Sequence, residues 1–299
     1  MGVVVAAISV HEAAQQQQLW SEAANVAKHS ILRWRATTLG LVMASALLAT
    51  LATQLANVPT TFGRLLSVTS GIAVGIVPVI RSFKLSRERL RDWTRLRSVS
   101  EGIKSEMYHY LAHVRPYADH DADQRLLTAI TQIADGAKDL QSRVLGPAPS
   151  DQSLPAVSDV PSYVTHRVDQ QIAEYYLPRA EDARKRLGLV EGIEFVLALL
   201  AVGLGVVAAT GGITWAAAWV PVVTTGAGAI AAHMAAAHYA DNLTAYSSTA
   251  AQLRRLKEKW LLNREVPGKA GAADEELVRS AEQVISIENR GWMAKLSST

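Results

Sequence analysis

Long apolar stretches alternate with polar, helix-forming segments along this chain. Four apolar stretches cover residues 36–56, 65–80, 193–210 and 213–232. Hydrocarbon about 30 Å thick is crossed by roughly 20 helical residues, and the first stretch contains no charged residue. Because the stretches form two close pairs, the pattern predicts an all-α membrane protein with two tandem transmembrane hairpins, four helices in all.

Basic residues flank the apolar pairs on one side only. They are Lys28, Arg33 and Arg35 before the first stretch; Arg81, Lys84, Arg87, Arg89 and Arg91 after the second; Arg179, Arg184, Lys185 and Arg186 before the third; and Arg254, Arg255, Lys257 and Lys259 after the fourth. The two hairpin connections carry only Arg64. The positive-inside rule therefore predicts a multi-pass protein of the inner (plasma) membrane, with both termini and the middle segment in the cytoplasm.

The segments outside the apolar pairs have the periodicity of amphipathic helices. Apolar residues recur at steps of three and four residues: Trp93, Leu96, Val99, Ile103, Met107 and Tyr110, then Leu126, Leu127, Ile130 and Ile133, then Leu253, Leu256 and Trp260, and finally Leu277, Val278, Val284 and Ile285. We expect each second membrane helix to continue into the cytoplasm and these faces to form a helical bundle. Val3–Val10 fits either a short strand or an interfacial segment, and neither is assigned.

The order of elements in the first half recurs in the second, with a period near 155 residues. Val68-Thr69-Ser70-Gly71 matches Val223-Thr224-Thr225-Gly226. The sequence thus predicts a repeat over 11–145 and a second over 163–299. Residues 146–162 are rich in Pro and Ser and are predicted to be a non-helical linker.

Composition narrows the functional classes. The chain has no cysteine, which suits a cytosol-facing protein, and its net charge of +3 gives no reason to expect a nucleic-acid partner. No P-loop, HExxH, GxSxG or paired-carboxylate arrangement occurs outside the interface, so we expect no enzymatic activity and no cofactor. Gly203-Leu204-Gly205-Val206-Val207-Ala208 has the letters of a dinucleotide fingerprint but lies within an apolar helix. We expect its glycines to allow close helix packing.

Two glutamates stand one turn apart at the inner mouth of the third apolar stretch. Ionisable groups near hydrocarbon are costly and face a cavity, a partner or headgroups. Glu191 and Glu194 are therefore candidate pore-mouth residues, with His233 at the same level on the neighbouring helix. A ring of such carboxylates in an oligomer would attract cations. The alternative, favoured on general grounds, is that they reach the interface or pair with Lys185 and Arg186.

Hydroxyl residues occupy matched positions in the second and fourth stretches. Thr69 and Ser70 correspond to Thr224 and Thr225, and the four could line a polar path through the membrane. The favoured alternative is that each bonds its own helix backbone.

A histidine pair offers a weaker candidate site. His109 and His113 have a spacing that can hold a metal, with Asp119, His120, Asp121 and Asp123 downstream. Because no further ligand completes the set, a solvated turn is the favoured interpretation, and no metal site is predicted.

The whole pattern resembles the SLATT superfamily, bacterial two-helix membrane domains associated with nucleotide-second-messenger conflict systems. The residues that carry the resemblance are the first hairpin, flanked by Arg33 and Arg35, with its basic exit Arg81-Ser82-Phe83-Lys84-Leu85, and Glu191-Gly192-Ile193-Glu194 with the Ala/Gly-rich second hairpin. The resemblance implies a membrane effector that forms pores or perturbs the membrane when a bacterial defence system is triggered, without established catalytic residues. It also implies that a sensor of the trigger is a cytosolic, nucleotide-signalling partner or lies within the bundle.

Four spans are too few to enclose much of a pore, so we expect a homo-oligomer with closed symmetry. The first functional hypothesis is an oligomeric pore or ion channel gated by its cytoplasmic helices. The alternative is a non-conducting membrane scaffold or sensor that recruits cytosolic partners. A secondary transporter is a third hypothesis, suggested only by the parallel repeat.

Overall fold

A computed structural model describes residues 2–55, 61–144, 154–210 and 214–298, without the side chains of residues 2–8, 214, 215, 233, 235–237 and 288–298. Within these ranges the chain is helical and contains no strand. The long helices are α1 (Gly2–Gln54), α2 (Thr61–Lys84), α3 (Arg87–Leu111), α4 (Ala122–Asp135), α7 (Leu177–Ala209), α8 (Thr214–Ala237), α9 (Tyr239–Arg264) and α10 (Ala270–Ser298). Short helical segments are η1 (Lys138–Leu140), α5 (Gln141–Val144), α6 (Val160–Tyr163), η2 (Val164–Asp169) and η3 (Gln171–Tyr176).

The helices form two compact units, which we call the hairpin unit and the bundle unit. The hairpin unit comprises His29–Arg89 and Ala183–Ala240. The bundle unit comprises Met1–Lys28, Leu90–Asp182 and Asp241–Thr299.

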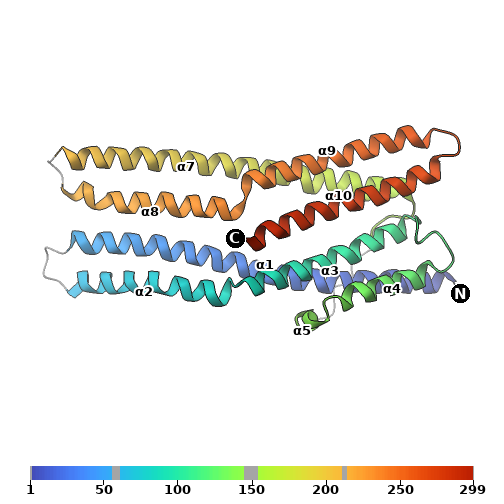
Figure 1. Ribbon diagram of the computed structural model, residues 1–299, viewed down its shortest axis with the longest axis horizontal. Coiled ribbons are helices and arrows are strands. Elements are labelled where there is room, and N and C mark those ends of the chain that lie inside the picture. The colour runs from blue at the N-terminus through green and yellow to red at the C-terminus, as the bar shows by residue number, and fades with distance from the viewer. Residues whose placement is uncertain (1, 56–60, 145–153, 211–213, 299) are drawn as a thin grey trace. The chain divides into compact units, whose positions relative to one another are not determined.

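The hairpin unit contains both predicted hairpins, α1 with α2 and α7 with α8 (Figure 1). Three described helices are long and apolar enough to cross a membrane: Ser9–Gln54, Thr61–Lys84 and Val160–Ala209. The fourth predicted span, in α8, has a shorter apolar stretch over the described residues Ala216–Ala232. The structure therefore supports three spans by length, and the fourth stays a prediction.

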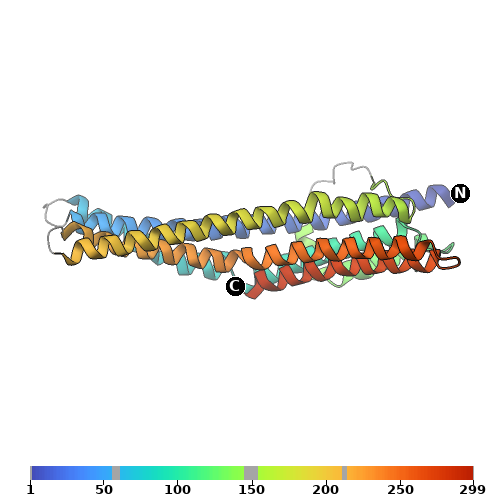
Figure 2. The same cartoon turned by 90° about the horizontal axis from the view of Figure 1, so that it is seen from above.

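The bundle unit buries the predicted apolar faces. Trp93, Leu96, Val99, Ile103 and Met107 of α3 are all buried. The core continues through Leu126 and Ile130 of α4, Leu253 and Trp260 of α9, and Leu277, Val278 and Ile285 of α10. Figure 2 shows α9 and α10, in orange and red, running alongside each other. These faces are helix packing surfaces, as the periodicity predicted.

The expected continuity of the helices is wrong in both halves. We expected each second membrane helix to continue beyond the bilayer, but α2 ends at Lys84 and α8 at Ala237. The hydroxyl of Ser86 accepts a hydrogen bond from the backbone N–H of Arg89 at 3.4 Å, capping the new helix α3. His238, between α8 and α9, has a left-handed φ of 49°, which a continuous α-helix excludes. The first membrane helices are the continuous ones, since Val160–Ala209 is a single helical run of 50 residues.

The structure assigns one segment that the sequence left open and corrects one predicted linker. Val3–Val10 lies inside α1, so it is helical and not a strand. Of the predicted linker 146–162, residues up to 153 lie outside the described part, but Val160–Tyr163 is a helix. Asp159 caps it by accepting a bond from the N–H of Ser162 at 2.8 Å. Pro161 fits because the first turn of a helix needs no donor there.

Candidate functional site

The hairpin unit presents apolar side chains outward. Its exposed large hydrophobic residues include Leu47, Leu51, Phe62, Leu65, Val68, Ile72, Val74, Ile76, Val79, Phe83, Leu189, Ile193, Phe195, Val196, Leu199, Leu200, Val202 and Val206. Soluble monomers rarely expose apolar patches larger than a few hundred Å². A surface of this extent over α1, α2 and α7 is one that bilayer hydrocarbon would cover.

Four hydroxyl residues of the same unit are buried inside it. Ser45 of α1 and Ser70 of α2 are both buried, and so are Thr38 and Thr50. The Ser70 hydroxyl donates to the carbonyl oxygen of Ser45 at 2.9 Å, and the two hydroxyl oxygens lie 3.1 Å apart. Polar groups inside and apolar groups outside are the reverse of a water-soluble bundle. This arrangement is the one expected of helices that pack in lipid, where interhelical hydrogen bonds contribute to association.

One glycine brings a helix of each hairpin into close approach. A Cβ built at Gly226 of α8 would lie 3.4 Å from Cε of Met43 in α1, which is van der Waals contact between the two helices. The fingerprint-like glycines differ. Gly203 and Gly205 have no described neighbour within 4 Å of such a Cβ, and the same is true of Gly71, Gly75 and Gly228. Among these six glycines, a close approach to another described helix of the same chain is found only at Gly226, and packing of the other five against a second subunit stays a prediction.

The four predicted hydroxyl residues have different surroundings. Thr69 is exposed and donates to the carbonyl oxygen of Leu65 at 2.8 Å. Thr224 is likewise exposed and donates to that of Val220 at 3.0 Å. Thr225 is half-buried, and Ser70 points into the α1–α2 contact. The alternative that these groups bond helix backbone is thus correct for Thr69 and Thr224.

The predicted carboxylates lie on α7. Glu191 is exposed and Glu194 is half-buried. The side chain of His233, the third candidate of this group, lies outside the described residues. The histidines of the weaker candidate site bond backbone carbonyls: His109 Nδ1 lies 2.9 Å from the oxygen of Ser105, and His113 Nδ1 lies 3.1 Å from that of Leu111. No metal-binding group of three or more His, Cys, Asp or Glu occurs among the described residues.

A buried ion pair at the centre of the bundle unit was not foreseen from the sequence. Arg167 of η2 donates from Nε and from one terminal nitrogen to the two carboxylate oxygens of Glu282 in α10, at 2.9 and 3.0 Å. Both side chains are only 3% exposed. The hydroxyl of Tyr163 donates to the same carboxylate at 3.0 Å. The Arg167 guanidinium also lies 4.3 Å from the ring centroid of Tyr108 in α3.

Electrostatics hold this pair in its charged form. Burial alone would raise the pKa of Glu282, but the charge of Arg167 and the bonds from Arg167 and Tyr163 lower it overall. Burial opposes the charge of Arg167 as well, yet the Glu282 carboxylate raises the pKa of the guanidinium. Burial, followed by repulsion from Arg167, lowers the pKa of the half-buried Lys104.

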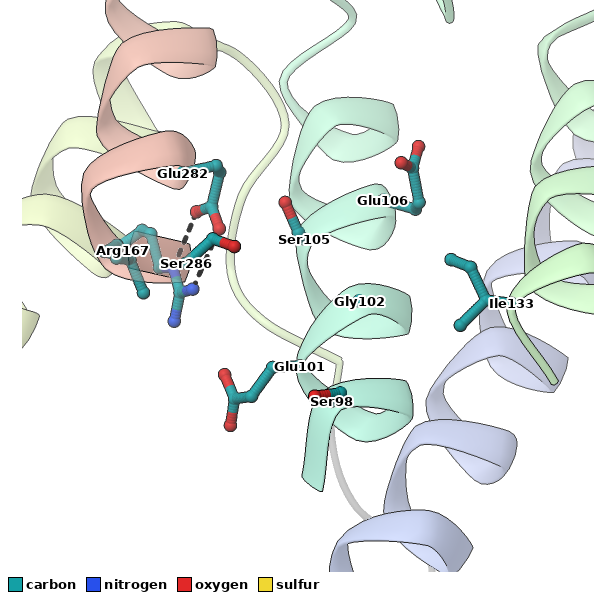
Figure 3. Close-up of a pocket in the computed structure, with 10 residues that line it drawn as sticks. Ser98, Glu101, Gly102, Ser105, Glu106, Ile133, Arg167, Glu282 and Ser286 are labelled. Carbon is teal, nitrogen blue, oxygen red and sulfur yellow. Dashed lines mark hydrogen bonds and ion pairs between the residues drawn. The ribbon is translucent and has the colours of Figure 1, made fainter. Parts of the chain in front are cut away.

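A pocket of about 290 Å³ adjoins the ion pair. It is lined by Ser98, Glu101, Gly102, Ser105 and Glu106 of α3, Ile133 of α4, Arg167 of η2, and Glu282, Ile285 and Ser286 of α10. Figure 3 shows Arg167, Glu282 and Ser286 facing the α3 residues across it.

The charged groups of the pocket have partners within the protein. Glu101 pairs with Arg97 at 2.5 Å, and Glu106 accepts a bond from the Tyr117 hydroxyl at 2.5 Å. Glu282 pairs with Arg167, as described above. The pocket lining therefore gives no preference for a charged ligand.

Comparison with protein families assigns the second half of the chain. Residues 163–292 match the family model SLATT_1, described as "SMODS and SLOG-associating 2TM effector domain 1". The second half is a SLATT domain. The resemblance predicted from hydropathy is confirmed for this half.

The SLATT domain contains the main candidates of the second half. Glu191, Glu194, Thr224 and Thr225 fall within it, and both partners of the buried Arg167–Glu282 pair do too. The family description calls the domain 2TM, and the matched residues include α7 and α8.

The first half matches a different family model. Residues 16–125 match "Protein of unknown function (DUF4231)". No curated protein and no solved structure matches the chain. A tandem duplication of the SLATT domain therefore stays a prediction. The order of long helices α1–α4 in the first half matches that of α7–α10 in the second.

Proposed function

We propose that the protein is a membrane effector that spans the bilayer with four helices and self-associates into a pore or ion channel. The observation that carries the proposal is the large apolar outer surface of the hairpin unit, in a chain that carries a SLATT effector domain. The exposed glycines of α2 and α7 support self-association, because small residues let membrane helices of separate subunits approach closely.

Orientation and context belong to the same proposal. The basic residues beside each hairpin favour cytoplasmic termini and the inner membrane of a bacterium. A defence system is the context that the word "effector" in the family description suggests. In this proposal the bundle unit lies in the cytoplasm, controls opening and receives a signal from a cytosolic sensor. We also propose that the two halves are SLATT-like repeats.

Ion flux tests the proposal directly. The purified protein is reconstituted into liposomes and into planar bilayers, with single-channel conductance as the readout. Glu191→Gln with Glu194→Gln should reduce cation preference if these carboxylates line the mouth. The matched control is Glu258→Gln, an exposed glutamate of α9. An unchanged cation preference would remove the glutamates from the pore mouth.

A non-conducting scaffold is the second candidate. It is favoured by Thr69 and Thr224, because each hydroxyl donates to its own helix and so needs no polar surroundings in a pore. A scaffold would show no flux from an inserted, oligomeric protein. Imaging of particles in nanodiscs separates the two functions further, since a channel needs a water-filled axis and a scaffold does not.

A further inference from the structure

The segment before the second hairpin has an unusual helical pitch. Consecutive π-helical turns, η2 and η3, interrupt the long helix between Val160 and Ala209. π-Helical turns are rare, occur mostly as single bulges and are frequent at functional sites. Two in succession, joined to a membrane helix, therefore call for a physical explanation.

The sequence itself specifies this pitch. Six buried residues of this segment recur at a strict spacing of four: Val160, Val164, Val168, Ile172, Tyr176 and Ala180. In a regular α-helix each four-residue step drifts by about 40°, so five steps would turn Ala180 roughly 200° from Val160. The π turns remove this drift and keep all six residues in the core.

The pitch becomes regular where the π turns end. After Ala180 the next buried residue is Ala183, and the half-buried residues Leu187, Val190 and Glu194 follow at steps of four, three and four. This is ordinary α-helical spacing. The two π turns therefore hold two extra residues in a helix that is otherwise regular.

Ion pairs from η2 hold the π turns in place. Arg167 is bound to Glu282 of α10, and Lys257 of α9 binds both carboxylate oxygens of Asp169 at 2.6 and 2.8 Å. Tyr176 of η3 packs against Tyr246 of α9, with ring centroids 6.3 Å apart. The ion pairs tie one short stretch of helix to two separate helices, and so they fix its register.

We propose that η2 and η3 are a register switch for α7, latched by the Arg167–Glu282 and Asp169–Lys257 ion pairs. When the latch opens, a π turn relaxes to α-helix and returns its extra residue to the helix. The rest of α7 then turns by about 100° and advances by about 1.5 Å for each residue returned. One returned residue places position 182 where position 183 stood.

This switch deepens the proposed function. Only its role in gating rests on that function, and the register change itself does not. The turn of α7 would carry Glu191 and Glu194 with it and so change what they face. The register change itself can be measured whether or not the protein conducts ions, so failure of one idea is distinguishable from failure of the other.

Cysteine reactivity reports the register. The chain has no cysteine, so single cysteines can be introduced at Ala183, which is buried, and at Asp182, which is exposed. The rate at which each of the variants Ala183→Cys and Asp182→Cys reacts with a water-soluble maleimide is then measured. The latch is opened by Glu282→Gln and, separately, by Lys257→Gln, whose pair is partly exposed and is the less disruptive to break. In both latch variants we expect position 183 to react at least tenfold faster and position 182 to become protected.

A deletion variant that lacks the two extra residues should be unable to change register. Deleting the exposed residues His166 and Ala173 shortens two of the four-residue steps to three, which produces the regular spacing of an α-helix. This variant should fold, keep position 183 protected and show no exchange when Lys257→Gln is added. As a control, deleting the exposed Ser248 and Arg255 from the regular helix α9 should lower the melting temperature, because it displaces the buried Leu253 and Trp260.

Three results would overturn the proposal. The first is unchanged reactivity at both positions in a folded Lys257→Gln protein. The second is faster reaction at both positions, which indicates local unfolding and not a change of register. The third is the same exchange in the deletion variant, which has no extra residue to return.

Discussion

Ser45 and Ser70 join the two helices of the first hairpin through buried hydroxyl groups, with the Ser70 hydroxyl 2.9 Å from the carbonyl oxygen of Ser45. Interhelical hydrogen bonds in membranes contribute about 0.6 kcal/mol on average and up to about 1.7. Ser45→Ala with Ser70→Ala should therefore weaken the hairpin by roughly 1 kcal/mol, measured by thermal unfolding in nanodiscs. Thr69→Val is the control, because its hydroxyl bonds only its own helix. Equal effects of the two changes would contradict this role.

Removing one partner of the buried Arg167–Glu282 pair should destabilise the fold strongly, whereas replacing both partners with apolar residues should change its stability little. Removing one partner of a buried pair destabilises by about 3–5 kcal/mol, whereas replacing both with apolar residues is often neutral. Arg167→Ala or Glu282→Ala alone should therefore lower the melting temperature strongly. Arg167→Met with Glu282→Leu should recover most of the loss.

An exposed ion pair provides the comparison for the buried one. Arg115 and Glu275 lie 3.2 Å apart, but Arg115 is 80% exposed. Such pairs contribute about 0–1 kcal/mol, so Arg115→Ala should change the melting temperature little. A loss as large as that of Arg167→Ala would mean that burial does not decide the energetics of these pairs.

Hydropathy predicted the membrane hairpins, and periodicity predicted the faces of α3, α4, α9 and α10. Both are local patterns, because burial in lipid or in a core repeats along one helix. The Arg167–Glu282 pair joins residues 115 positions apart, and no local pattern in one sequence specifies such a partner. The four-residue spacing from Val160 to Ala180 was a readable signal for the π turns.

Helix ends were predicted less well than helix faces. Ser86 followed by Arg87 and Glu88 is a readable cap, and it marks the end of the α2 run that we expected to continue. The left-handed φ of 49° at His238 has no such signal, because histidine carries no preference strong enough to mark a break. Packing around the residue decides its conformation, and a single sequence does not contain that information.

Stability should depend on pH through Glu282. Burial alone would raise its pKa, but Arg167 and Tyr163 lower it below the ordinary value of 4.5. A carboxyl whose pKa is lower in the folded state than in the unfolded state stabilises the fold at pH values above its unfolded-state pKa. This contribution is lost as the pH falls through the folded-state pKa. The melting temperature should therefore fall below about pH 4.5 more steeply in the native protein than in Glu282→Gln. Parallel profiles would exclude Glu282 as the group responsible.

The charged form of Lys104 should destabilise the bundle unit. Burial, then repulsion from Arg167, lowers its pKa from 10.5, so its charge is disfavoured by folding at neutral pH. Lys104→Met should raise the melting temperature by about 2 °C, since about 1 kcal/mol corresponds to a few degrees in a protein of this size. Lys138→Met, at an exposed site, is the control and should change nothing. The gain should shrink as pH rises through the folded pKa of Lys104.

The outward apolar surface of the hairpin unit can be tested with two matched leucines. Leu200 of α7 is 51% exposed and Leu262 of α9 is 71% exposed, so neither is held by a core. An arginine at the centre of a membrane helix costs about 2.5–3.5 kcal/mol on insertion scales, whereas one on a water-facing helix costs little. Leu200→Arg should therefore reduce the fraction of protein that resists carbonate extraction from membranes, and Leu262→Arg should not. Equal behaviour of the two variants would mean that water, and not lipid, covers Leu200, and the four-span arrangement would have to be abandoned.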